Sequence, residues 1–235
     1  EGQDRYDIQL PADQREFLQE IYKVNPNIIV VLVAGSSLAV NWMDEHIPAI
    51  VNAWYPGEQG GTAVADVLFG DYNPAGRLPL TYYKSLDELP PFDDYDITKG
   101  RTYKYFKGDV LYPFGYGLSY SSFKYSDLKV KDGADTVTVS FRLKNTGKRK
   151  GDEVVQVYLR CMADKEGPHY TLRAFKRVHI PAGETKQVTI SLTYESFEWF
   201  DTATNTVHPL KGTYELLYGG SSDKNKLKTI VMNVQ

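Results

Sequence analysis

Apolar positions in residues 1–90 follow helical and strand periods in alternation. Between residues 11 and 24 they recur on one helical face, and the run at 28–33 is continuous and β-branched. Such a run, bounded by turn residues, is typical of a parallel strand buried on both faces. A second strand is predicted at 48–54 and a second helix at 58–69, which Gly70 is placed to end. This order indicates part of a doubly wound α/β sheet.

Two loops follow the predicted strands, at residues 35–37 and 55–57. Ligands of open α/β sheets lie beyond the carboxyl ends of the strands. We therefore expect these two loops to line a crevice at the same edge of the sheet.

From residue 123 onward, apolar positions alternate with polar ones. Val137, Val139 and Phe141 alternate with Thr138 and Ser140, which is the period of a half-buried strand. Turn signals recur at the spacing of a β-sandwich. Many short strands of this kind predict an immunoglobulin-like or fibronectin III-like sandwich. The predicted strands are 123–131, 136–145, 153–161, 171–180, 187–192, 198–200, 213–218 and 227–234.

The residues between these two regions are rich in Pro, Asp and aromatic side chains. A loop of this length without a role is uncommon, so we expect an ordered connection that packs across other domains. The chain then divides into part of an α/β domain (1–90), an aromatic-rich connection (91–122) and a fibronectin III-like domain (123–235).

Composition excludes several classes of protein. Hydrophobic residues make up 42% and charged residues 24% of the 235, which is ordinary globular usage. A net charge of -3 gives no electrostatic footprint for nucleic acid. No apolar run reaches the roughly 18 residues of a membrane span. Cys161 is the only cysteine, so an intramolecular disulfide is impossible. The 18 tyrosines suit both sandwich packing and sugar rings.

Metal and cofactor motifs are missing from the sequence. His46, His169, His179 and His208 are scattered, without the short spacing of zinc ligands. The glycines form no phosphate-binding loop, and the serine pair at 36–37 lacks the GxSxG elbow of a serine hydrolase. We expect neither a metal ion nor a cofactor.

Several segments resemble glycoside hydrolase family 3, and they occur in family order. The first five residues, EGQDR, match that family's EGxDR motif, and Leu10, Pro11 and Gln14 match the helix entry that follows. Residues 54–80 resemble its most recognisable signature, and 112–120 (YPFGYGLSY) resemble its hallmark before the last domain. Residues 144–159 resemble the opening of its fibronectin III-like domain. The resemblance implies an N-terminal (β/α)8 barrel that is absent from this chain, and it implies that residues 1–90 are the C-terminal part of the family's α/β sandwich domain.

The resemblance also implies a divided catalytic pair. Retaining glycosidases use a nucleophile and a general acid/base about 5–5.5 Å apart. The family's nucleophile is a barrel aspartate, whereas its acid/base is a sandwich-domain glutamate that Glu1 matches. Glu1 is the predicted catalytic acid/base, with a pKa raised by apolar walls or by the nucleophile. Asp4, Arg5 and Trp42 are substrate-binding candidates, although Asp4 and Arg5 could instead fix the loop and Trp42 could be buried.

Two hypotheses follow. The first is a secreted or periplasmic retaining exo-β-glycosidase that cleaves terminal non-reducing β-linked sugars from an oligosaccharide or an aryl or alkyl glycoside. Its expected partner is a barrel, on the same or on a separate chain, that carries the nucleophile. A homodimer is a further possibility that the sequence does not decide. Residues 100–106 (GRTYKYF) resemble a stretch of xylosidase-type members and favour β-xylosidase over β-glucosidase. The second hypothesis is a non-catalytic carbohydrate-binding or interaction module, because one carboxylate cannot complete a double displacement.

Overall fold

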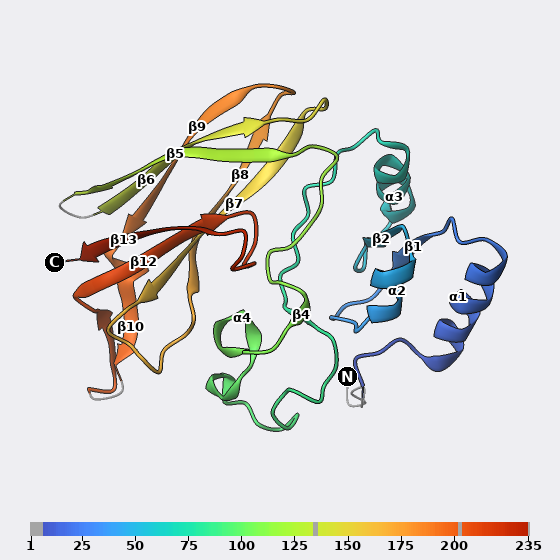
Figure 1. Ribbon diagram of the computed structural model, residues 1–235, viewed down its shortest axis with the longest axis horizontal. Helices are drawn as coiled ribbons and strands as arrows, with labels where there is room; N and C mark the ends of the chain where they lie inside the picture. Colours follow the sequence, from blue (N-terminus) through green and yellow to red (C-terminus); the bar gives the residue numbers. More distant parts are fainter. Residues whose placement is uncertain (1–6, 134–135, 202–203, 235) are drawn as a thin grey trace. The chain divides into compact units, whose positions relative to one another are not determined.

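The computed structural model describes residues 7–133, 136–201 and 204–234 (Figure 1). The chain forms two compact units. Neither unit is one continuous stretch of chain, because two short segments, 73–79 and 96–106, belong to the same unit as the strands after residue 114. Unit one comprises 7–72, 80–95 and 107–113, and unit two comprises 73–79, 96–106 and 114–234.

Unit one begins with the helix that the sequence predicts, α1 (Ala12–Val24). Pro11 precedes its first turn, where a missing N–H costs nothing. Asn25 ends the helix in an extended conformation, and its N–H donates to the last turn. Leu18 and Tyr22 pack against the apolar core of this unit, so one face of α1 is fixed by burial.

Two parallel strands, β1 (Ile29–Leu32) and β2 (Ala49–Asn52), form a two-stranded sheet in unit one, with Ile29 opposite Ala49. The helix α2 (Asn41–His46) lies between them in the chain. It was not predicted, because six residues are too few to show a helical period. The buried core of this unit consists of Leu32, Leu38, Val40, Met43 and Ile47.

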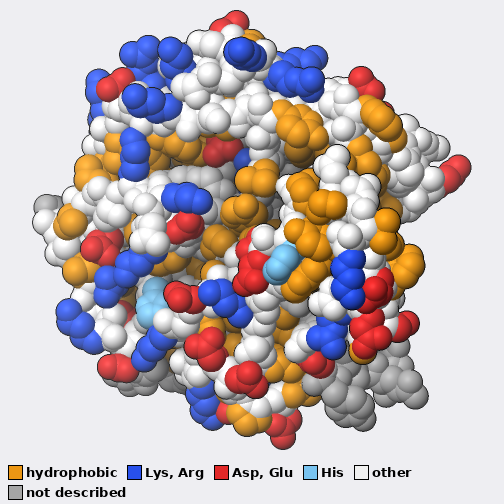
Figure 2. Space-filling model, turned by 45° about the vertical axis from the view of Figure 1, so that its right-hand side comes forward, with side chains coloured by type: hydrophobic (Ala, Val, Ile, Leu, Met, Phe, Trp, Pro, Cys, Tyr) orange, Lys and Arg blue, Asp and Glu red, His pale blue; other side chains and the backbone are white. Residues whose placement is uncertain are grey.

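The prediction that the first strand is buried on both faces is wrong for the described chain. Ile29 is 52% exposed and Val33 is 61% exposed, whereas Leu32 is buried. On α1, Phe17 is 68% exposed and Val24 is 88% exposed. Figure 2 shows that apolar side chains reach the surface on the side of the molecule that it draws. Since parallel sheets are normally covered on both faces, unit one presents an open apolar face.

The helix α3 (Gly60–Phe69) begins two residues later than predicted, after a turn at Gly57. It ends at Gly70, whose φ of 83° is the left-handed conformation expected of a glycine cap. Farther along the chain, β3 (Tyr82–Tyr83) and β4 (Val110–Tyr112) pair in antiparallel fashion.

Unit two is a β-sandwich of two antiparallel sheets, with strand orders β13-β12-β7-β8 and β5-β6-β9 (Figure 1). Every predicted strand is present. A further strand, β11, pairs with β10 and was missed, because its four residues end in proline and alternate too briefly to show a period. The strands are β5 (Phe123–Asp132), β6 (Thr136–Asn145), β7 (Gly151–Cys161), β8 (Thr171–Ile180), β9 (Thr185–Thr193), β10 (Glu198–Asp201), β11 (Thr206–Pro209), β12 (Gly212–Gly219) and β13 (Lys228–Val234).

The core of unit two follows the alternation of its strands. Val137, Val139, Phe141 and Leu143 of β6 are at most 1% exposed. Strands β7, β9 and β12 add inward residues to the same cluster, and the short helix η2 (Tyr194–Phe197) closes one side with a fully buried phenylalanine. The predicted fold class, an α/β part followed by a fibronectin III-like sandwich, is confirmed.

Part of the predicted connection is integral to unit two. It contains η1 (Ile97–Lys99) and α4 (Thr102–Tyr105). The Tyr103 ring stacks on Phe114 with centroids 4.6 Å apart, and its hydroxyl accepts the Leu172 N–H at 3.0 Å. The xylosidase-like stretch at 100–106 therefore contributes to packing. Within the described ranges, no helix combines the length and apolar character needed to cross a membrane.

Candidate functional site

The segment that follows the predicted acid/base lies beside the loop after β1. The Ala39 N–H donates to the Ile8 carbonyl at 2.9 Å, and Gln9 forms a parallel bridge with Ala39. Glu1, Asp4 and Arg5 lie outside the described residues, so their predicted roles stay predictions.

Trp42 belongs to an aromatic cluster at the edge of the unit-one core. Its ring stacks on His46 with centroids 4.7 Å apart and planes 13° apart, and Tyr22 meets it edge-on at 5.4 Å. The His46 Nδ1 also forms a hydrogen bond with the Trp42 carbonyl at 2.8 Å. These contacts favour the packing role for Trp42, and its contact with sugar stays a prediction.

The two predicted crevice loops meet at the carboxyl end of β1 and β2. A Cβ placed on Gly35 would lie 2.5 Å from Cε2 of Tyr55, so only glycine lets that ring lie against the first loop. Tyr55 is 77% exposed, and Trp54 has a left-handed φ of 54°. Left-handed backbone costs a residue other than glycine about 1–3 kcal/mol and clusters at functional sites. This edge is therefore the leading candidate for substrate contact among the described residues of unit one.

Two tyrosine hydroxyls form hydrogen bonds between neighbouring elements of unit one. Asn52, at the end of β2, donates from Nδ2 to the Tyr82 hydroxyl at 2.7 Å. Burial raises the pKa of the Tyr82 phenol, although the Asn52 hydrogen bond lowers it. The Tyr112 hydroxyl donates to the Asp44 carboxylate at 2.6 Å. Both tyrosines are committed to neighbouring elements, which gives them a positioning role rather than a reacting one.

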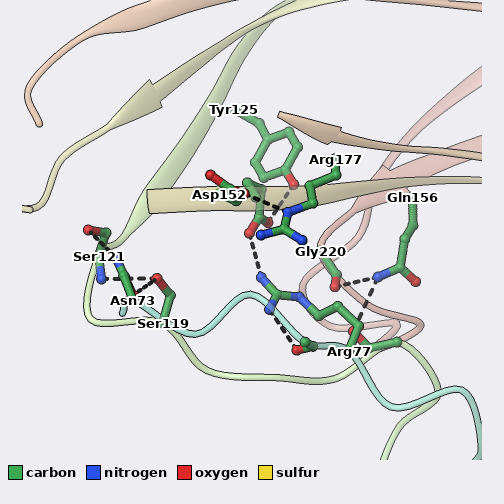
Figure 3. Close-up of polar contacts among 12 residues, drawn as sticks. Asn73, Arg77, Ser119, Ser121, Tyr125, Asp152, Gln156, Arg177 and Gly220 are labelled. Atoms are coloured by element: carbon green, nitrogen blue, oxygen red, sulfur yellow. Dashed lines mark hydrogen bonds and ion pairs between the residues drawn. The ribbon is translucent and has the colours of Figure 1, made fainter. Parts of the chain in front are cut away.

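A buried ion pair fixes the segment 73–79 within unit two (Figure 3). Arg77 donates from Nη2 to Glu153 Oε2 at 2.7 Å, and the two side chains are only 10% and 8% exposed. The Tyr125 hydroxyl donates to the other oxygen, Oε1, at 2.7 Å. Burial and the Glu153 charge raise the pKa of Tyr125 well above its ordinary value. Both carboxylate oxygens of Glu153 are therefore occupied by donors from other segments.

Asn73 makes the second attachment of the same segment. Its Oδ1 accepts from the Ser119 hydroxyl at 2.9 Å and from the Tyr120 N–H at 2.8 Å (Figure 3). Its Nδ2 donates to the Lys150 carbonyl at 2.9 Å and to Ser121 Oγ at 3.2 Å. One amide thus joins three separate stretches of unit two.

Gln156 holds the segment that begins at residue 114. Its Nε2 donates to the Gly220 carbonyl at 2.6 Å and to the Gly115 carbonyl at 3.2 Å (Figure 3). A Cβ on Gly115 would lie 2.1 Å from Gln156 Oε1, and its φ is 79°, so this position requires glycine. Residues 73–79 of the signature and residues 114–120 of the hallmark thus have a structural role in unit two.

The sequence analysis singled out these segments, but it did not predict their partners on β7, Glu153 and Gln156. A signal for one of them was present, since Glu153 shares its strand face with Val155 and Val157, and a carboxylate at an inward position needs a buried partner. Among the described residues, no three His, Cys, Asp or Glu side chains come together in a way that could hold a metal ion.

Residues 1–120 match the Glycosyl hydrolase family 3 C-terminal domain, and residues 153–222 match the Fibronectin type III-like domain. A xylan 1,4-beta-xylosidase of Xylanibacter ruminicola is 46% identical over 235 residues, covering 99% of this chain and 27% of that protein. A beta-xylosidase of Formosa agariphila is 37% identical, covering 100% of this chain and 34% of that protein.

Solved structures give the same likeness. A beta-glucosidase from Kluyveromyces marxianus in complex with glucose matches with a TM-score of 0.90 and 34% identity, covering 100% of this chain and 30% of that chain. The chain therefore spans about a third of the length of the relatives it matches.

Proposed function

Because the chain belongs to glycoside hydrolase family 3, we propose that it is the C-terminal part of a retaining exo-β-glycosidase whose catalytic pair is divided between two stretches of polypeptide. Glu1 acts as the general acid/base, and the nucleophilic carboxylate lies on a barrel outside this chain. The supporting observation is that the chain aligns over nearly its whole length with proteins 46% and 37% identical to it that are named xylosidases, and it covers only 27% and 34% of them.

The open apolar face of unit one supports completion by further polypeptide. Phe17, Ile21 and Val24 on α1 are 37–88% exposed, at positions that share a helical face. Ile29, at the start of β1, and Val33, directly after its end, are also more than half exposed. Burying such side chains stabilises a fold by about 25 cal/mol for each Å² of apolar surface removed from water. This burial matters most for the two-stranded parallel sheet, because a sheet of two strands is only marginally stable by itself.

The substrate is a glycoside with a terminal β-linked sugar, and xylose is preferred over glucose. The relatives at 46% and 37% identity are named as xylosidases, which favours xylose, while others at 35–37% are named as glucosidases. The stretch at 100–106, which first suggested xylose, carries less weight now that Tyr103 is engaged in packing. A relative from Salmonella typhimurium is named as periplasmic, which supports an exported enzyme.

The test is replacement of Glu1 by alanine in the full-length protein. Loss of the proton donor should lower kcat on an unactivated xylobioside by about 10²–10⁴-fold. The variant should still cleave a nitrophenyl xyloside, because this leaving group needs no proton. Added azide should restore its turnover by attacking the glycosyl-enzyme intermediate, which releases a glycosyl azide. Glu20→Ala, which removes an exposed carboxylate on α1, is the matched control. Unchanged kinetics in the Glu1 variant would remove this residue from the mechanism.

A further inference from the structure

The three-stranded sheet β5-β6-β9 of unit two has an outward face made of polar side chains (Figure 1). Side chains that alternate with the buried residues of β6 point away from the core. The register of β5 against β6 places five cations on this outward face, and these are Lys124, Lys129, Lys131, Arg142 and Lys144. The other outward positions of β6 and β9 carry hydroxyl or amide groups, among them Thr138, Ser140, Gln187, Thr189 and Ser191.

These cations have few carboxylates near them. Strands β6 and β9 contain no Asp or Glu. On β5, Asp127 Oδ2 lies 3.6 Å from Arg142 Nη1, whereas Asp132 is opposite Val137 and so belongs to the inward side. Among the described residues, the four lysines of the face form no ion pair. The face is therefore cationic, in a chain whose net charge is -3.

One arrangement on this face is unfavourable in the chain alone. Lys124 on β5 lies directly opposite Lys144 on β6, and like charges at such positions destabilise a sheet. Lysines on an edge strand such as β5 protect it from pairing with another sheet. That explanation does not extend to Lys144, because β6 is the central strand and has a neighbour on each side. An anion bound between the two strands would relieve the repulsion.

The other side chains of the face select among polyanions. None of the large hydrophobic residues that are exposed on the described chain belongs to β5, β6 or β9. Helices that enter a lipid surface and grooves that bind unpaired nucleic acid both use such side chains, and protein interfaces use aromatic anchors. Hydroxyl and amide groups beside cations instead match the hydroxyls and carboxylates of an acidic sugar chain.

We propose that the outward face of β5-β6-β9 binds an acidic polysaccharide, a glycan chain that carries uronic acid residues. A uronate carboxylate accepts hydrogen bonds from both Lys124 and Lys144, and sugar hydroxyls bond to the neighbouring Gln187. From position 138 to position 144 the face extends about 20 Å along β6, which suits a chain of several sugars. No bond is broken here, so the site goes beyond the proposed hydrolase function and does not depend on it.

Titration calorimetry of the 235-residue chain with polygalacturonate at low salt tests the site. We expect saturable binding that weakens as salt is added. The double variant Lys124→Thr with Lys144→Thr should bind about five- to tenfold more weakly. Its thermal midpoint should not fall, because the repulsion is removed and threonine suits a strand.

The matched control removes the same charge elsewhere. Lys211→Thr with Lys224→Thr changes two exposed lysines of unit two outside this sheet, and it should bind as the wild type does. Should the first double variant fail to fold, Lys129→Thr with Lys131→Thr takes its place, with the same expected loss.

Fully methyl-esterified polygalacturonate, duplex DNA and phosphatidylglycerol vesicles are the comparison probes. Binding that is lost on esterification and weakened in the face variant, but not in the control, supports the proposal. It is overturned by the absence of saturable binding to polygalacturonate in the wild-type chain, by an unchanged affinity in the face variant, by an equal loss in the control, or by tighter binding to DNA or vesicles. Each of these results leaves the catalytic proposal untouched.

Discussion

The two units differ in the size of their buried cores. Unit two has a large cluster of buried side chains drawn from most strands of both sheets, a second cluster around Tyr158 and Tyr170, and a buried ion pair between Arg77 and Glu153. Unit one has five buried core residues and leaves Phe17, Ile29 and Val33 more than half exposed. Unit two also leaves Phe175, Phe200 and Val231 more than half exposed, so the two units differ in the size of the buried core rather than in surface exposure. The small core of unit one supports the proposal that another surface completes it.

Truncation of the sandwich core should have the largest effect. Phe141 is fully buried, with the rings of Tyr125 and Tyr218 5.6 Å and 5.3 Å away. Phe141→Ala should lower the free energy of unfolding of unit two by about 3–5 kcal/mol, because it leaves a cavity. Urea unfolding followed at Trp199, in a chain with Trp42 and Trp54 replaced by Phe, measures this unit alone. Phe175→Ala, 69% exposed on β8, is the matched control and should change little.

Breaking the buried ion pair should come next. Glu153→Leu leaves the Arg77 guanidinium buried without its counter-charge and should cost about 3–5 kcal/mol. The double variant with Arg77→Met should recover most of that loss, since it removes the stranded charge. Glu215→Leu is the control, because its pair with Arg160 is partly exposed and should cost under about 1 kcal/mol. A double variant no better than Glu153→Leu would show that the pair is not coupled in this way.

Alkaline pH should destabilise unit two through its buried tyrosines. Burial raises the pKa of Tyr170 from 10.0 to about 12. A phenol whose pKa is raised on folding favours the folded state fully below its unfolded pKa, and that contribution is lost as pH rises through the folded value. The loss should approach about 2–3 kcal/mol between pH 10 and 12, at about 1.4 kcal/mol for each pKa unit. Tyr170→Phe should flatten this pH dependence of the urea midpoint, and an unchanged slope would contradict the assignment.

The open face of unit one should show the smallest effect in the chain alone. Ile29→Ser replaces a residue that is 52% exposed, so the isolated chain should lose no more than about 0.5 kcal/mol of stability. In the full-length protein the same change should cost about 1–3 kcal/mol, because we propose that further polypeptide covers this side chain there. Thermal unfolding of both forms makes the comparison. Equal effects in the two forms would mean that nothing covers this face.

The sequence predicted the secondary structure and burial of unit two better than the burial of unit one. The period of Val137, Val139 and Phe141 is enforced by burial within the chain itself, so the sandwich strands could be predicted. The first strand could be located at 28–33, but the exposure of Ile29 and Val33 could not be predicted, because a continuous apolar run does not report which of its faces the rest of the chain covers.

The candidate site was predicted less completely. The meeting of the loops at Gly35 and Tyr55 followed from the parallel strand order. The pairing of Arg77 with Glu153 joins residues 76 positions apart, and the local pattern around each gives no register between them. The predicted roles of Glu1, Asp4 and Arg5, and the domain boundaries at 90 and 122, stay predictions.

Hydrolysis of nitrophenyl β-xyloside by the purified 235-residue chain tests the divided catalytic pair most directly. One carboxylate cannot both attack the sugar and protonate the leaving group. We predict no turnover above the uncatalysed rate for the chain alone, and recovery of activity when it is mixed with the polypeptide that carries the remainder of the protein. Substantial turnover by the chain alone, retained in the Glu1→Ala variant, would contradict the account.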